Sequence, residues 1–198
     1  MSEKKVDWDR VYRQNYWSWA FSDIQWISKA KDLLQSAKLI EPKVLRLWEN
    51  YQEKLDGITD ELLPDHYQGT FFMLLAYAVE NLLKAAIIRK KSLEYKSKFR
   101  ETLKFPKELQ SNDLVNLARK AQLEFSREEE DLLRRLTRSA VWYGRYPIPL
   151  HYKHSSGAET FCDGKDYLVS WFGGNDVERL NKFVDMLKEK LTSEMSDQ

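Results

Sequence analysis

The sequence has few of the residues that cross-link or interrupt a chain. Its 198 residues include one cysteine (Cys162), seven glycines and five prolines. A single cysteine excludes an internal disulfide and a zinc site built from several cysteines. The scarcity of glycine and proline argues against a β-sandwich with many tight turns and favours long helices. We therefore expect an all-α protein.

Strong charge imbalance and common enzyme motifs are also missing. The formal net charge is +1, and residues 1–7 contain no apolar region of the kind that signal peptides have. No phosphate-binding glycine loop, serine-hydrolase elbow or zinc-protease motif occurs. His151 and His154, with Asp163 nearby, lack the regular spacing of metal ligands. We expect cytoplasmic localisation, with no metal, no cofactor and no membrane partner.

What the chain does have is an aromatic N-terminal part, residues 1–64, which we expect to form helices that pack on the remainder. Trp8, Tyr12, Tyr16 and Trp19 follow helical spacing and form one stripe. The stripe either packs on the rest of the protein or serves as a stacking platform for bases or a dimer surface. No basic cluster interleaves it in the sequence, which argues against binding of single strands. Pro42 is expected in the first turn of a second helix.

The most apolar segment, FFMLLAYAVENLLKAAII, covers residues 71–88. Its length is that of a membrane-spanning helix, but Glu80, Asn81 and Lys84 would each cost on the order of 2–3 kcal/mol near a bilayer centre. Glu80 and Lys84 have the i, i+4 spacing of a helical ion pair. We expect the central helix of a bundle, whose polar residues either bond to neighbouring helices or line a binding site.

A basic stretch follows, with nine Lys or Arg residues against two Glu between Lys84 and Lys107. Such a stretch is either a solvated connector or a phosphate-contacting surface.

Two further helix starts can be recognised. Ser111, Asn112 and Asp113 form a capping cluster, and Ser126 to Glu129 form a capping box for a helix that ends at Gly144. Residues 151–174 are expected to form a loop or small hairpin, and residues 175–198 a C-terminal helix and tail.

Three segments in order, AVENLLKAAI, SNDLVNLARKAQL and AVWYGRYP, resemble the HEPN superfamily. The middle segment of that family reads His-Asp/Asn-Leu-x-x-Leu, and here Asn112 replaces the histidine. The Arg-Tyr pair that closes the family's last helix is present as Arg145 and Tyr146. The resemblance covers about residues 67–151. It implies an up-and-down bundle of four to five core helices over residues 65–150, with extra N-terminal and C-terminal helices.

The resemblance also implies two kinds of function. Many HEPN proteins are dimeric, metal-independent endoribonucleases with an Arg-x4–6-His motif, and others are non-catalytic partners of nucleotidyltransferases in toxin–antitoxin-like pairs. Arg145 and His151 have the allowed spacing, but Pro147 and Pro149 disfavour the helix on which the motif usually lies. We therefore expect a homodimeric module of an RNA- or nucleotide-linked, toxin–antitoxin or defence-like system, with a nucleotidyltransferase-type partner. The alternative is an endoribonuclease that uses Arg145 and His151.

The chemistry of these two residues suits RNA cleavage. Histidine titrates near neutral pH and can move a proton, and arginine binds phosphate oxygens with two parallel hydrogen bonds. Arg145 could instead have a structural role, either by bonding the last carbonyls of its helix or by pairing with Glu80. The structural alternative for His151 is that it is an ordinary loop residue. Five further residues are predicted to contribute to binding: Glu80, Lys84, Asn112, Asp113 and Tyr146.

Overall fold

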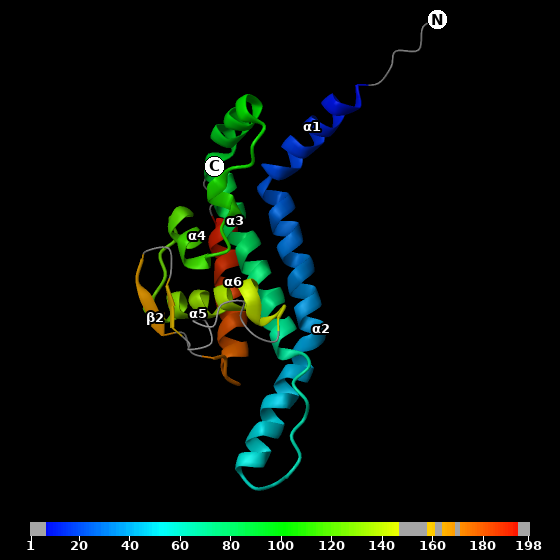
Figure 1. Ribbon diagram of the computed structural model, residues 1–198, viewed down its shortest axis with the longest axis vertical. Helices are drawn as coiled ribbons and strands as arrows, with labels where there is room; N and C mark the ends of the chain where they lie inside the picture. The colour runs from blue at the N-terminus through cyan, green and yellow to red at the C-terminus, as the bar shows by residue number, and fades with distance from the viewer. Residues whose placement is uncertain (1–6, 147–157, 161–163, 169–170, 194–198) are drawn as a thin grey trace, which may run out of the picture.

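Two long helices form the frame of the molecule. The computed structural model describes residues 7–146, 158–160, 164–168 and 171–193. Figure 1 shows α2 (Asp23–Leu55) and α3 (Gln68–Thr102) running antiparallel along the long axis, while α1 (Trp8–Ala20) projects beyond the start of α2. The expectation of an all-α helical bundle with additional terminal helices is confirmed.

The shorter elements follow α3 in the chain. They are the 3-10 helix η1 (Lys107–Gln110), α4 (Leu114–Lys120), α5 (Arg127–Arg138), the π-helical turn η2 (Ser139–Tyr143), strands β1 (Ala158–Thr160) and β2 (Asp166–Leu168), and α6 (Asp176–Ser193). The two strands pair in antiparallel register, with Ala158 opposite Leu168. α3 lies at the centre and contacts α2, α4, α5, η2 and α6.

The apolar run of α3 is the core of this bundle. Phe71, Phe72, Leu83 and Ile87 are among its fully buried side chains. By length and composition α3 could cross a membrane, but 78% of its apolar window is buried inside the protein. Contacts with the other helices therefore account for the run.

Helix α2 differs from the expectation at Pro42. We expected a helix to begin there, but α2 continues through Pro42 for 33 residues. A proline inside a helix removes one backbone hydrogen bond. The extensive packing of α2 on α3, which includes the buried Ala37 and Val44 on either side of Pro42, keeps the helix continuous.

The predicted helix caps are confirmed. The Asp113 side chain accepts a hydrogen bond from the Asn116 backbone N–H at the start of α4. Ser126 and Glu129 form the reciprocal capping box of α5, at 3.2 and 2.7 Å. The expected Glu80–Lys84 ion pair on α3 is also present, with 2.6 Å between Oε1 and Nζ.

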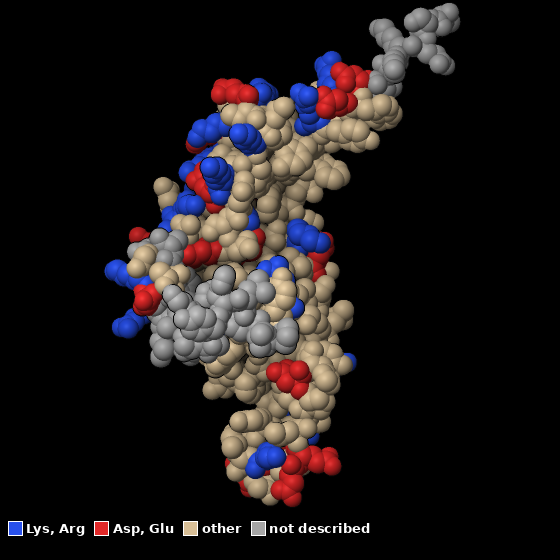
Figure 2. All heavy atoms as spheres, in the orientation of Figure 1, with Lys and Arg blue, Asp and Glu red and all other residues tan. Residues whose placement is uncertain are grey.

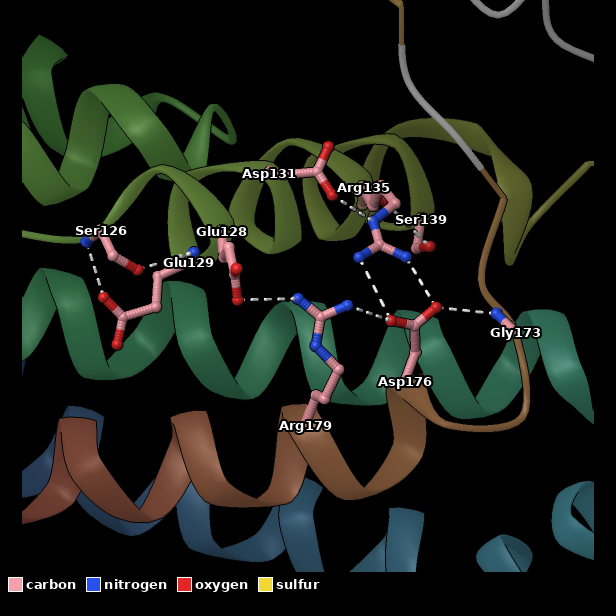
Figure 3. A network of polar contacts seen from close by, with 9 residues as sticks. All are labelled: Ser126, Glu128, Glu129, Asp131, Arg135, Ser139, Gly173, Asp176 and Arg179. Carbon is pink, nitrogen blue, oxygen red and sulfur yellow. Dashed lines mark hydrogen bonds and ion pairs between the residues drawn. The ribbon is translucent and has the colours of Figure 1, made fainter.

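A network of charged side chains joins α5 to α6 (Figure 3). Arg135 of α5 donates two hydrogen bonds to the Asp176 carboxylate, at 2.7 and 3.2 Å. The same carboxylate accepts the backbone N–H of Gly173 at 2.7 Å, and Arg179 lies between Asp176 and Glu128. The start of α6 is thus held to α5 at Arg135 and, through Arg179, at Glu128.

Tyr95 of α3 donates a hydrogen bond to Glu108 of η1. Burial, and then this bond, raise the pKa of the phenol above its usual value near 10. Because the folded pKa exceeds the unfolded one, Tyr95 stabilises the fold fully below about pH 10 and loses this contribution as pH rises through the folded pKa. We expect the free energy of unfolding, measured by urea titration, to fall above about pH 10 more steeply in the wild type than in Tyr95→Phe. Equal slopes would contradict this.

Candidate functional site

The end of η2 positions Arg145 and Tyr146 at the surface. Both side chains are exposed, and the guanidinium carbon of Arg145 lies 5.5 Å from the Tyr146 ring centroid. Nη2 of Arg145 donates a 2.6 Å hydrogen bond to the carbonyl oxygen of Val141. The structural alternative in which Arg145 bonds the carbonyls of its own helix is therefore confirmed, and Glu80 pairs with Lys84 instead. Since a guanidinium has five N–H donors, this one bond leaves others for an anion.

Close contact between η2 and the start of α3 fixes where Arg145 lies. A Cβ atom on Gly144 would lie 2.3 Å from Cβ of Met73 and 2.7 Å from the carbonyl oxygen of Gly69. These distances are shorter than any ordinary contact, so the two segments approach this closely only because residue 144 is glycine.

Gly144→Ala is expected to lower the free energy of unfolding by about 1–3 kcal/mol, because the added methyl group must push η2 away from α3. Urea titration measures this. Gly174→Ala is the matched control, since its Cβ would meet only Trp48 at 3.5 Å, an ordinary contact. Equal stability of the two variants would show that η2 can move without cost.

An aromatic cluster packs around η2, next to Arg145. Trp142 and Tyr143 of η2 contact Trp171, with ring centroids 6.1 and 5.0 Å apart. The guanidinium carbon of Arg138 lies 4.3 Å from the Trp171 ring centroid, which is a favourable cation–π distance. Burial, and then the charge of Asp65, raise the pKa of Tyr143 above its ordinary value. The residues beside Arg145 are therefore held by packing.

The other predicted binding residues lie elsewhere. Lys84 is buried beneath Trp26, with Nζ 5.7 Å from the ring centroid. Gly69 of α3 contacts the end of η2. Glu80 lies eleven positions further along α3, which is a rise of about 16 Å. The structure therefore does not bring Glu80 and Lys84 to Arg145.

Asn112 and Asp113 lie at the start of α4, where Asn112 is exposed and Asp113 caps the helix. The next residue, Leu114, donates its backbone N–H to Thr137 Oγ1 of α5 at 3.0 Å. Thr137 lies eight residues before Arg145, about 12 Å along a helix. Asn112 and Asp113 are thus also apart from Arg145, and Asp113 has a structural role in the cap.

The predicted catalytic histidine, His151, lies outside the described residues, as do Pro147, Pro149, His154 and Asp163. In the part of the chain that the structure describes, no three His, Cys, Asp or Glu side chains are grouped as metal ligands.

The structure also brings together two segments that the sequence left separate, the aromatic stripe and the basic stretch. The C-terminal half of α3 carries the basic stretch to the side of α1, where Lys96 and Arg100 both lie over the ring of Trp17, at 5.3 and 4.8 Å from its centroid. Residues 84–102 of the basic stretch are therefore part of α3, and Lys104 lies in the connection to η1. Trp17 and Arg100 are 83 residues apart, so only the packing of α1 against α3 brings them together.

Comparison of the chain with protein-family models, with curated proteins and with solved structures gives no match in any of the three.

Proposed function

We propose that this protein is a HEPN-like, homodimeric helical module that binds RNA or a nucleotide and acts beside a nucleotidyltransferase-type partner in a toxin–antitoxin or defence-like system of the cytoplasm. The all-helical bundle is compatible with that family. The observation that carries the proposal is the exposed Arg145 beside Tyr146. Both follow the end of η2, in the segment AVWYGRYP that resembles the family.

This pair has the properties of a phosphate- and base-contacting site. Arg145 supplies a permanent positive charge with planar donors, and Tyr146 supplies an exposed ring on which a base can stack. The hydrogen bond to Val141 and the packing of η2 hold the guanidinium in place before a ligand arrives. Such preorganisation reduces the entropy lost on binding.

The second candidate function is metal-independent RNA cleavage, which the exposure of Arg145 favours. In that reaction Arg145 would stabilise the charge that develops on the phosphate, and His151 would move a proton to or from a reacting oxygen. The composite site would then need the Arg145 and His151 of both subunits.

One experiment tests both functions. Purified wild type, Arg145→Ala, His151→Ala and the control Arg127→Ala, an exposed arginine at the start of α5, are incubated with a mixed RNA pool in EDTA and assayed for binding and cleavage. If the protein binds RNA without cleaving it, we expect the RNA to stay intact and the affinity of the wild type for RNA to fall steeply as the salt concentration rises. Arg145→Ala should weaken it by about 1.5–3 kcal/mol, and Arg127→Ala should leave it unchanged.

Cleavage by the wild type that both Arg145→Ala and His151→Ala abolish, with Arg127→Ala still active, would instead establish the ribonuclease. Absence of RNA and nucleotide binding even at low salt would contradict both functions.

A further inference from the structure

We propose that α1 and the C-terminal half of α3 form a binding surface for unpaired RNA, in which bases stack on exposed aromatic rings and phosphates contact neighbouring cations. This inference rests on the proposed function for the identity of the ligand, RNA. It concerns a different surface, because Arg145 follows Gly144, which contacts Gly69 at the opposite end of α3.

The aromatic half of the surface is a hollow of about 470 Å³ lined by α1, the start of α2, Asn81 of α3 and Phe105. Tyr16 and Trp19 of α1 line it and are 47% and 67% exposed. Opposite them Trp26 and Phe105 stack on each other, with ring centroids 6.3 Å apart. Lys29 also lines the hollow. Exposed flat rings that form a nearly apolar hollow are what single-strand binding proteins offer to unstacked bases.

The stripe continues along α1 with Trp8 and Tyr12, which are 61% and 66% exposed. The interpretation that this stripe packs on the rest of the protein does not hold for these side chains. No residue of α1 is buried, although a helix of 13 residues has little stability in water without a packed face. The exposed rings of α1 are therefore available to a ligand that would also stabilise the helix.

The cationic half is a second hollow, of about 290 Å³, lined by Arg13, Trp17, Phe99 and Arg100 among others. Lys96 and Arg100 lie over the Trp17 ring. Among the described residues neither is paired with a carboxylate, whereas Lys91 and Lys98 of the same helix pair with Glu108 and Glu94. Two cations on an indole ring thus remain for an anionic partner.

The two hollows are neighbours. Phe99 lines the cationic hollow and Tyr16 the aromatic one, and their rings stack with centroids 5.2 Å apart. Figure 2 shows Lys and Arg side chains on α1 and on the C-terminal half of α3, with Asp and Glu among them. A chain that alternates flat bases with negative phosphates complements this juxtaposition of rings and cations. An apolar protein helix would match the rings but would desolvate Lys96 and Arg100 without a partner.

The absence of a basic cluster that interleaves the stripe argued against single-strand binding when the sequence alone was considered. The structure removes that objection, because α3 adds Lys96 and Arg100 to Arg13 of α1 around Trp17.

The test measures fluorescence anisotropy of a labelled RNA of roughly 16 nucleotides, single-stranded or paired with its complement, with the full chain. The variants are Trp19→Ala and Lys96→Gln/Arg100→Gln. Their controls are Tyr51→Ala, an aromatic of α2 with comparable exposure, and Lys182→Gln, an exposed lysine of α6. Circular dichroism verifies that each variant is folded.

We expect the wild type to prefer the single strand. Trp19→Ala should weaken binding roughly 5- to 100-fold. The double variant should reduce the slope of log affinity against log salt by about 0.7 for each lost phosphate contact, and both controls should bind as the wild type does.

Three results would overturn the inference. Equal or tighter binding of the duplex would exclude base stacking. If Trp19→Ala and the double variant bind RNA as the wild type does, and Arg145→Ala loses RNA affinity, then the RNA binds at Arg145 alone. That result would leave the proposed function intact. No RNA binding by any protein at low salt would overturn the inference and the RNA-binding form of the proposed function.

Discussion

Asp176→Ala is expected to lower the free energy of unfolding by about 3–5 kcal/mol, because it leaves the buried guanidinium of Arg135 without the carboxylate that it binds with two hydrogen bonds. Arg135 is 4% exposed and keeps its ion pair with Asp131, 2.9 Å from Nε, but the donors at Nη1 and Nη2 lose their acceptor. The substitution also removes the acceptor of the Gly173 N–H. Urea titration, followed by circular dichroism, measures the change.

Two variants separate the buried charge from other effects. Glu178→Ala removes a carboxylate from the same first turn of α6, but its ion pair with Lys182 is about three-quarters exposed, so no measurable change is expected. Asp176→Asn keeps the shape of the side chain and removes its charge, and it should be destabilised nearly as much as Asp176→Ala. Equal stability of Asp176→Ala and Glu178→Ala would show that the ion pair with Asp131 is enough to hold Arg135.

Features set by residues close together in the chain could be predicted from the sequence. The capping box at Ser126, the cap at Asp113 and the Glu80–Lys84 pair each involve side chains within four residues, and all three are present. The burial of the apolar run of α3 was predictable because a helix that is apolar on most sides must be covered by other helices. The continuation of α2 through Pro42 was not, because it depends on packing against α3.

Features that depend on distant pairing could not be predicted. Arg134, Arg135 and Arg138 of α5 have the i, i+3, i+4 spacing of a solvated helix face, yet all three are buried. Arg135 is buried because α6 brings Asp176 to it from 41 residues away. For the candidate site, the sequence singled out Arg145, which the structure places at the surface on the end of η2. The sequence also marked the basic stretch as a possible phosphate-contacting surface, but not that its Lys96 and Arg100 lie over Trp17.

Phe72→Ala is expected to lower the free energy of unfolding by about 3–5 kcal/mol, because it opens a cavity in the centre of the bundle. Phe72 of α3 is fully buried and stacks on Phe172, with ring centroids 3.8 Å apart. Phe172 precedes α6, so this stack joins the C-terminal segment to α3. Urea titration measures the loss, with Leu93→Ala as control, since Leu93 lies on the same helix and is 84% exposed.

Phe72 and Asp176 hold the same segment, and this coupling can be measured. The guanidinium carbon of Arg135 lies 5.0 Å from the Phe172 ring centroid, so Phe172 contacts both Phe72 and the partner of Asp176. The loss in the double variant Phe72→Ala/Asp176→Ala should therefore differ from the sum of the single losses by about 0.5–3 kcal/mol. Strict additivity would mean that the aromatic stack and the ion pair hold α6 independently. A large coupling would mean that once either contact is lost the segment before α6 is already released from the bundle, so that the second substitution has less left to disrupt.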